Sequence, residues 1–221
     1  MISDNLTIII PTKNSSDSVL NLLNQLAEQT DISGTKVILS DHSNDYKKFD
    51  TMALQYSDDF DFEIEVHEGA ENPYKSVNKV LDEIETPYFL TLTDGVKFKS
   101  HQTIYNCLVE LKSSDSKIII PKLDMPSTGF VNSLLKMKFK AKLKTHPFSP
   151  LSFFFAETEH VVGVGGFSTY QVEIHEEISL CDSFSEDDIY TSDELVQVPD
   201  DMEMVNGYLK RVKEIKGDSD G

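Results

Sequence analysis

The chain of 221 residues carries a formal net charge of −18, and 39% of its residues are hydrophobic. This acidity excludes a general nucleic-acid binder, because the phosphate backbone would be repelled, and no apolar run reaches the ~20 residues that a membrane span needs. The chain starts without the basic segment of a secretory signal, and its two cysteines lack metal-site spacing. We therefore expect a cytoplasmic protein with no transmembrane segment and at most peripheral membrane contact.

The first predicted element is a strand buried on both faces. Residues 6–10 form an almost continuous apolar run, and Pro11 predicts the end of the strand because proline cannot donate to a sheet ladder. Three polar residues follow it: Thr12, Lys13 and Asn14. A helix is predicted directly after them, since apolar residues recur at helical spacing between Val19 and Ala27. The turn contains no glycine, so it suits contacts with a base or a ribose better than a tight cradle for phosphates.

Strands and helices then alternate as far as residue 121. Further strands are predicted at 35–40, 62–67, 88–92 and 117–121, and helices at 46–56, from Pro73 towards Thr86-Pro87, and at 101–112. This alternation predicts an α/β fold with a mainly parallel central sheet and helices on both faces. Polar residues 12–14, 41–45 and 93–95 follow three of the strands. Because the carboxyl ends of parallel strands share one edge, we expect a binding site there.

The second part of the chain has a different character. Lysine occupies every second position from Lys136 to Lys144, which predicts a strand with one charged face. Residues 202–215 predict an amphipathic C-terminal helix. We expect one domain built from two halves, 1–125 and 126–221.

Six segments, in chain order, resemble those of family 2 glycosyltransferases, which have the GT-A fold. They are LTIIIPTKN, ILSDHSND, Asn78, the strand leading to Thr93-Asp94-Gly95, Gly165-Gly166-Phe167 and Glu186-Asp187. The resemblance implies that residues 1–125 bind a nucleoside-diphosphate sugar and that 126–221 form the acceptor and catalytic half. It assigns nucleotide binding to Pro11, Thr12, Lys13, Asn14, Asp41, Asn78, Thr93 and Asp94. It assigns contacts with the sugar or the acceptor to Gly165, Gly166 and Phe167.

The family holds a divalent metal through the last aspartate of a D-x-D motif. Here the matching triplet ends in Gly95, so Asp94, one position earlier, is the candidate ligand for Mg²⁺ or Mn²⁺. Three interpretations stay open. Asp94 is a shifted ligand; or a lysine neutralises the leaving diphosphate; or catalysis has been lost. The candidate lysines are Lys13, Lys75 and those of 136–144.

An inverting sugar transfer also needs a carboxylate that takes the proton of the acceptor hydroxyl. The resemblance makes Asp187 the expected base and Glu186 the second choice. Other carboxylates lie nearby in the sequence: Glu173, Glu176, Glu177 and Asp188. Packed carboxylates raise one another's pKa, which favours a base near neutral pH. The alternative for each of them is a solvated acidic face.

The leading hypothesis is therefore an inverting glycosyltransferase that moves a sugar from a nucleoside-diphosphate sugar to the hydroxyl of a glycan or another acceptor. The alternative is a catalytically degenerate GT-A-like domain that binds a nucleotide or a partner. A nucleotidyltransferase is disfavoured, because such enzymes generally carry a glycine-rich loop after the first strand and this chain does not.

Overall fold

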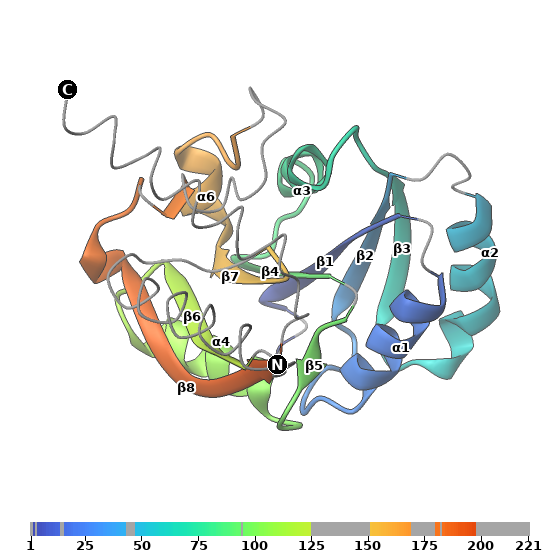
Figure 1. Ribbon diagram of the computed structural model, residues 1–221, viewed down its shortest axis with the longest axis horizontal. Coiled ribbons are helices and arrows are strands. Elements are labelled where there is room, and N and C mark those ends of the chain that lie inside the picture. Colours follow the sequence, from blue (N-terminus) through green and yellow to red (C-terminus); the bar gives the residue numbers. More distant parts are fainter. Residues whose placement is uncertain are drawn as a thin grey trace, which may run out of the picture.

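A single mixed sheet organises the molecule. The computed structural model describes residues 2, 4–13, 16–42, 47–93, 95–124, 151–168, 180–181 and 183–197. Within these ranges eight strands pair in the order β3-β2-β1-β4-β7-β6-β8-β5 (Figure 1). The strands are β1 (Leu6–Thr12), β2 (Lys36–Asp41), β3 (Glu63–Glu68), β4 (Tyr88–Leu92), β5 (Lys97–Phe98), β6 (Ile118–Asp124), β7 (Phe153–Glu157) and β8 (Ile189–Gln197). β7 and β5 run antiparallel to their neighbours, and the remaining pairs are parallel.

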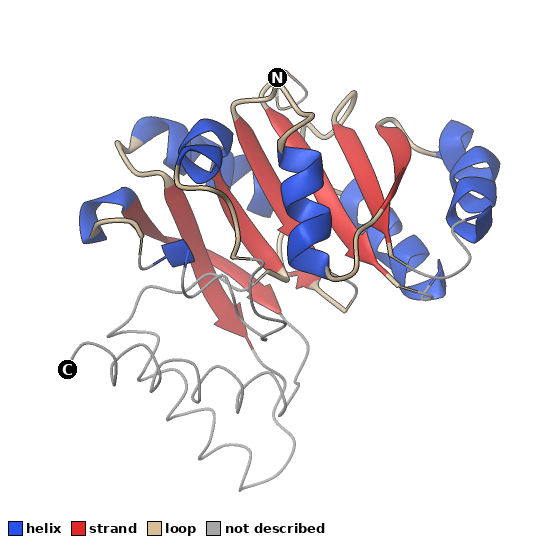
Figure 2. Cartoon of the chain, turned by 90° about the horizontal axis from the view of Figure 1, so that it is seen from above, coloured by secondary structure: helices blue, strands red, loops and turns tan. Residues whose placement is uncertain are grey.

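Helices cover both faces of this sheet, as Figures 1 and 2 show. The described helices are α1 (Ser16–Ala27), α2 (Lys47–Tyr56), α3 (Pro73–Leu81), α4 (Thr103–Ser113) and α6 (Thr158–Gly163), with short 3-10 turns η1 (Ser57–Asp59) and η2 (Glu186–Asp188). The predicted α/β class with a mainly parallel sheet is confirmed. The predicted strand at 136–144 and the predicted helix at 202–215 lie outside the described residues.

Two strands continue through a proline that was expected to end them. β1 includes Pro11, which pairs with Ser40 of β2 beyond the point where the ladder to β4 stops at Ile9. Proline is compatible with an extended backbone where one ladder is already absent. β6 passes through Pro121, and its register to β8 shifts between Ile120 and Lys122. The proline therefore sits at an irregularity, which is one of the few sheet positions that tolerates it.

The core consists of two layers, one on each face of the sheet. The first layer packs α1 and α4 on the sheet through Leu22, Leu23, Leu26, Ile104 and Cys107, and the second packs α3 and α6 through Val77, Val80 and Val161. β7 contributes to both, because successive strand side chains point to opposite faces. Phe153 and Phe155 belong to the first layer and Phe154 to the second. Burial raises the pKa of the Cys107 thiol to about 12, so it is an inert core residue.

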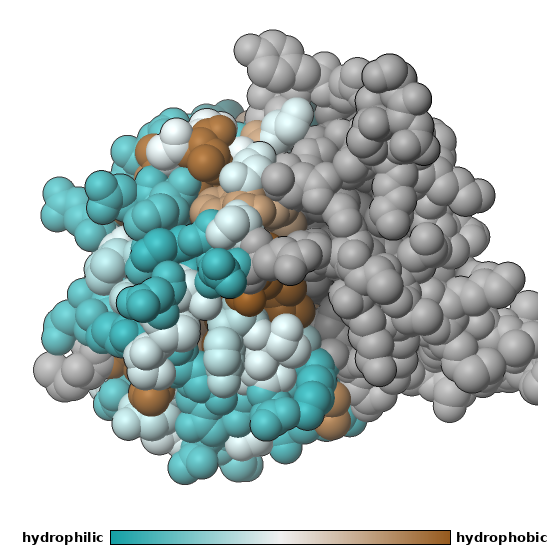
Figure 3. Space-filling view, turned by 90° about the vertical axis from the view of Figure 1, so that its left-hand side faces the viewer, coloured by the Kyte–Doolittle hydropathy of each residue, from teal (hydrophilic) through white to brown (hydrophobic). Residues whose placement is uncertain are grey.

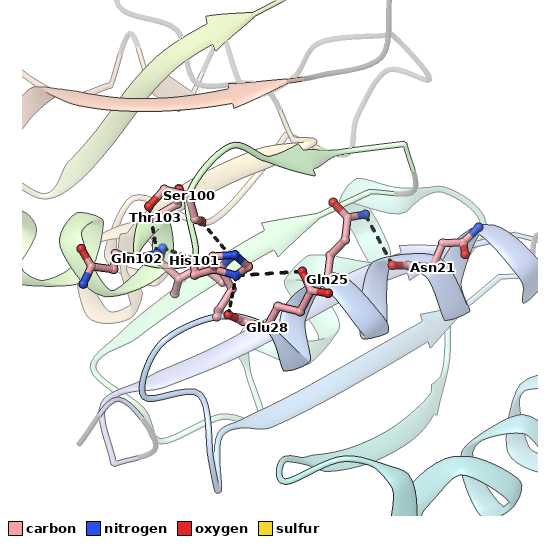
Figure 4. A network of polar contacts seen from close by, with 9 residues as sticks. Asn21, Gln25, Glu28, Ser100, His101, Gln102 and Thr103 are labelled. Atoms are coloured by element: carbon pink, nitrogen blue, oxygen red, sulfur yellow. Dashed lines mark hydrogen bonds and ion pairs between the residues drawn. The ribbon is translucent and has the colours of Figure 1, made fainter.

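A polar network joins the end of α1 to the turn before α4. The His101 ring lies against Glu28, and its Nδ1 is 3.0 Å from the Glu28 carbonyl oxygen (Figure 4). Gln29 donates to the Ser100 carbonyl at 3.0 Å and accepts from the Ile104 amide at 3.3 Å. These bonds pair main-chain groups at two helix ends, which would otherwise lack partners. They belong to the scaffold and lie away from the strand ends described below.

The described helices include none that is long and apolar enough to cross a bilayer. Among the described residues on the face seen in Figure 3, most are hydrophilic, and hydrophobic side chains show only as small areas. Scattered apolar side chains of this kind are normal on a protein surface.

Candidate functional site

The carboxyl ends of β1 and β2 lie side by side and bring the first predicted polar residues together. Thr12 is the register partner of Asp41, and the His42 amide donates to the Thr12 carbonyl at 3.1 Å. The Thr12 and Asp41 side chains are 4% and 1% exposed, whereas Lys13, the next residue, is exposed. The two strands thus place a buried hydroxyl and a buried carboxylate at one edge of the sheet.

Buried polar atoms without hydrogen-bond partners gather at this edge. Within the described part of the chain these atoms are Thr12 Oγ1, Ser40 Oγ, His42 Nδ1 and, beside the end of β4, Ser152 Oγ. Leaving a buried polar group unpaired costs about 1–3 kcal/mol, so such groups are few unless a ligand completes them. Two comparable atoms lie elsewhere: Thr35 Oγ1, at the amino end of β2, and Glu110 Oε2 on α4. The cluster at the carboxyl edge is the larger one and has the character of a ligand site.

His42 adds a neutral imidazole to this cluster. Burial lowers the pKa of His42 below its ordinary value of 6.5, and the positive charge of Lys13 lowers it further. The Ser40 carbonyl and the Asp41 carboxylate act in the opposite direction but do not prevail. At neutral pH the ring is therefore uncharged, and its nitrogens serve as one donor and one acceptor.

Gly69, which the sequence analysis did not single out, holds the next strand close to Asp41. Its amide donates to the Asp41 carbonyl at 2.7 Å, and a Cβ at this position would lie 2.7 Å from the Asp41 carbonyl carbon. No side chain fits that space without moving the backbone that carries Asp41. The signal in the sequence was a lone glycine two residues after the predicted third strand.

The end of β4 supplies the third polar turn. Thr93 accepts a hydrogen bond from Val96 at 3.4 Å, and Gly95 has a φ of +86°, which favours glycine. Asp94 and Asn14 lie outside the described residues. No group of three or more His, Cys, Asp or Glu side chains in the described ranges is arranged to hold a metal ion. The described residues therefore do not by themselves form the metal site that the resemblance implies.

The Gly165-Gly166-Phe167 segment lies against α3. The Asn78 side chain donates to the Phe167 carbonyl at 2.8 Å and accepts from the Phe167 amide at 2.9 Å. The Phe167 ring is buried and lies 5.8 Å from the ring of Tyr74, in the first turn of α3. The segment thus contacts α3 at Asn78, in the second half of the helix, and at Tyr74, in the first turn, which follows the carboxyl end of β3.

Asp187 lies at the opposite edge. β8 runs in the same direction as β6 and β1, so η2, which precedes β8, sits with the amino ends of the strands. The Ser116 hydroxyl donates to the Asp187 carbonyl at 3.2 Å, and Lys117 donates to the Asp188 carbonyl at 2.6 Å. A strand of the length of β1 spans ~20 Å. The structure therefore separates Glu186-Asp187 from Thr12 and Asp41, because the acidic stretch introduces a strand that the sequence analysis did not predict.

A cavity of about 600 Å³ lies elsewhere on the sheet. Its lining includes Thr7 of β1, Lys36 of β2, β3 as far as His67, and residues 83–86. Ion pairs occupy its walls: Lys36 with Glu65 at 2.7 Å, and His67 with Glu65 and Glu83 at 3.1 and 3.2 Å. These charged groups partner one another, so the cavity lacks the unpaired atoms that mark the carboxyl edge.

Comparisons with known proteins agree with the fold. Residues 7–179 match the family model described as Glycosyl transferase family 2, and no curated protein sequence matches the chain. The mannosyltransferase PcManGT from Pyrobaculum calidifontis, in complex with GDP-Man and Mn²⁺, superposes with a TM-score of 0.68 at 13% identity, over 87% of this chain and 56% of that chain. TarS 1-349 of S. aureus in complex with UDP-GlcNAc gives 0.64 at 15% identity, over 88% and 58%.

A third structure, mannosyl-3-phosphoglycerate synthase from Rubrobacter xylanophilus, gives a TM-score of 0.64 at 13% identity, over 99% of this chain and 76% of that chain. At these identities the similarity shows the GT-A fold alone. The chain spans 35% of the longer TarS structure and 60% of TarS 1-349.

Proposed function

Because the chain belongs to glycosyltransferase family 2, we propose that it transfers a sugar from a nucleoside-diphosphate sugar to an acceptor hydroxyl, with inversion at the anomeric carbon. The observation that carries the proposal is the buried Thr12 hydroxyl, which has no partner in the described residues and lies beside the buried Asp41 carboxylate. A base or a ribose offers the N–H and O–H groups that such a pair binds.

In this proposal the carboxyl ends of β1, β2 and β4 contact different parts of the nucleoside-diphosphate sugar. Asp41 accepts from a base N–H or a ribose hydroxyl, and Thr12 completes its hydrogen bonding on the same ligand. In this proposal Pro11 and Lys13 also belong to the nucleotide site and Thr93 to its diphosphate end. Asn14 and Asp94, which lie outside the described residues, keep the roles that the resemblance implies. Gly165 and Gly166, with φ values of +93° and +71°, let the main chain approach the sugar or the acceptor.

The transfer joins the acceptor oxygen to the anomeric carbon while the bond from that carbon to the diphosphate breaks, and the electron pair leaves with the diphosphate. A carboxylate takes the hydroxyl proton. Asp187 is too far from the carboxyl edge for this role, since a general base must be within hydrogen-bond reach. We therefore propose that the base is a carboxylate of the acidic segment that holds Glu173, Glu176 and Glu177. This segment lies outside the described residues. The described residues Phe167 and Leu180, which precede and follow this segment in the sequence, both belong to the core layer on the α3 face.

The base assignment has a direct test. Asp187→Asn is expected to keep transfer within twofold of the wild type, whereas Glu176→Gln or Glu177→Gln lowers it by at least 100-fold with nucleotide affinity unchanged. Loss of transfer in Asp187→Asn alone would return the role to Asp187.

Asp94 is the candidate ligand for Mg²⁺ or Mn²⁺, which would neutralise the charge that grows on the leaving diphosphate. Of the lysines considered for the same task, we take Lys13 as the candidate, because it directly follows Thr12 at the carboxyl end of β1. Assays with EDTA, with Mg²⁺ and with Mn²⁺ distinguish neutralisation by a metal ion from neutralisation by Lys13. Retention of transfer in EDTA, lost in Lys13→Gln, assigns the neutralising charge to Lys13.

The decisive experiment compares two threonines. Thr12→Val and Thr35→Val each remove a buried hydroxyl without a partner, so each is expected to stabilise the ligand-free protein by about 1 kcal/mol. Only Thr12→Val should weaken the binding of UDP or GDP, because Thr35 lies at the amino end of β2. Thermal shifts measure both, since a ligand at 100 times its Kd stabilises by about 2.7 kcal/mol. If neither nucleotide shifts the wild-type Tm, the proposal fails.

Gly95, in place of a D-x-D aspartate, favours a second candidate function. In this alternative the domain binds a nucleotide or a partner without turnover. Sugar transfer by the wild-type protein, lost in Glu176→Gln with the fold intact, excludes it. Cys107 and Cys181 are both buried and are not joined by a disulfide, which supports a cytoplasmic location.

A further inference from the structure

The Asn78 side chain is held in one orientation by a single main-chain residue. Its Nδ2 donates to the Phe167 carbonyl at 2.8 Å, and its Oδ1 accepts from the Phe167 amide at 2.9 Å. Because one partner is a donor and the other an acceptor, the assignment of oxygen and nitrogen in this amide is fixed by the contacts. The side-chain amide of Asn78 therefore uses one donor and one acceptor in its hydrogen bonds with the main chain of Phe167.

Gly166 makes this approach possible. Its φ is +71°, and a Cβ placed on it would lie 2.6 Å from Asn78 Oδ1 and 3.0 Å from Cγ. Real Cβ atoms do not approach an oxygen so closely. Gly165 also has a positive φ, but a Cβ there would meet no atom within 4 Å. Glycine is thus required at position 166 both by the nearby Asn78 side chain and by the positive φ of the residue.

The same helix is tied to the nucleotide edge at its other end. Asn72 caps α3 by accepting from the Lys75 amide at 2.9 Å, and Ser76 Oγ accepts from the Ala70 amide at 2.8 Å. The neighbouring Gly69 amide donates to the Asp41 carbonyl at 2.7 Å. One rigid element therefore joins the main chain of Asp41 to the turn at Gly165 and Gly166.

We infer that Asn78 is a positioning residue, which acts through Phe167 to fix the Gly165-Gly166 turn at a set distance from the nucleotide edge. In this role it does not touch the nucleotide. The inference rests on the proposed function for its activity readout, and it changes the role that the resemblance gave to Asn78. Because α3 holds both the Gly165-Gly166 turn and the main chain of Asp41, it keeps the part of the site that binds the sugar fixed relative to the part that binds the nucleotide. Small displacements between these parts would reduce turnover strongly.

The test uses two variants that break the contact and one that does not. Asn78→Asp keeps the shape and the acceptor for the Phe167 amide but sets a carboxylate oxygen against the Phe167 carbonyl. Gly166→Ala introduces the clash. Gly163→Ala, at the end of α6, is the matched control, because a Cβ there meets nothing within 4 Å and no positive φ is involved.

We expect the full chain of all three variants to bind UDP or GDP within twofold of the wild-type Kd by calorimetry. Transfer should fall at least tenfold in Asn78→Asp and Gly166→Ala and stay unchanged in Gly163→Ala. Loss of nucleotide binding in Asn78→Asp, or full turnover in that variant, overturns the inference.

A second readout does not depend on the proposed function. Amide hydrogen exchange at Phe167 should accelerate at least tenfold in Asn78→Asp and remain at the wild-type rate in Gly163→Ala. If the wild type binds neither nucleotide, the proposed function fails, while faster exchange at Phe167 still supports the role of Asn78 in holding the turn. Unchanged exchange in Asn78→Asp overturns it.

Discussion

The two edges of the sheet differ in how their polar groups are satisfied. At the amino edge, Glu157 accepts from His160 at 2.6 Å and lies 3.3 Å from Lys117, and the main chain of Lys117 joins η2. At the carboxyl edge, Thr12 Oγ1, Ser40 Oγ and His42 Nδ1 are buried without partners in the described residues. Apart from Thr35 Oγ1, these polar groups of the amino edge are paired within the chain, whereas we propose that a ligand completes the carboxyl edge. Removing a group should therefore change stability at the first edge and binding at the second.

The largest effect is expected at Asp41. Asp41→Asn keeps the volume of the side chain but removes the charge that strengthens its hydrogen bond to the ligand. Because hydrogen bonds to charged groups contribute about 1.5–3 kcal/mol, affinity for the nucleotide that binds the wild type should fall roughly 10- to 100-fold. Calorimetric titration measures this, and Asp115→Asn, an exposed residue before β6, is the control. Equal losses in both variants would remove the distinction between the edges.

Gly69→Ala should act on the same edge through the backbone. The added Cβ would lie 2.7–2.8 Å from the main-chain atoms of Asp41 and His42, so the strand end must move. Overpacking of this kind costs about 1–3 kcal/mol. Urea denaturation reports the loss as a lower midpoint, against Gly163→Ala as the control. An unchanged midpoint in Gly69→Ala would mean that the contact between β3 and Asp41 is not tight.

At the amino edge, Glu157→Gln should reduce stability alone. The variant weakens contacts with His160 and Lys117, and partly exposed ion pairs contribute up to about 1 kcal/mol. Nucleotide affinity should remain within twofold of the wild type. A marked loss of affinity in Glu157→Gln would show that the two edges are coupled and that the division drawn above is incorrect.

The smallest effect concerns the protonation of His42. Its pKa in the folded protein lies below 6.5, so folding favours the neutral ring. The stability that this contributes is present above pH 6.5 and is lost as the pH falls through the lower, folded-state pKa. NMR titration should show the pKa rise in Lys13→Gln, because a positive charge is removed, and stay unchanged in Lys97→Gln on β5. A lower pKa in Lys13→Gln would contradict the proximity of the two groups.

The first half of the fold was predictable because its signals are local. Continuous apolar runs predicted β1, β2 and β4, and Pro73 marked the start of α3, which Asn72 caps in the structure. The proximity of the polar residues that follow β1 and β2 could be predicted from the parallel direction of the two strands alone. The family resemblance is confirmed by the match of residues 7–179.

The remainder depends on long-range pairing that no local pattern encodes. β8 inserts between β6 and β5, so the acidic stretch at Glu186-Asp187 is carried to the amino edge. The sequence of β8, with polar residues at most positions, resembles a loop as much as a strand. The contact between Asn78 and Gly166 joins residues almost ninety positions apart, and only the folded structure reveals that the asparagine requires the glycine.

The central position of β7 has a consequence for how the protein is made. β4 pairs with β7, and β7 in turn pairs with β6, although β6 precedes β7 in the chain. A nascent chain that ends before residue 153 presents two unfinished ladders, on β4 and on β6, with nothing between them. The sheet therefore closes only after the three consecutive phenylalanines of β7 have left the ribosome. Protection of those open ladders during synthesis is a task for chaperones, and a truncated N-terminal half is expected to aggregate.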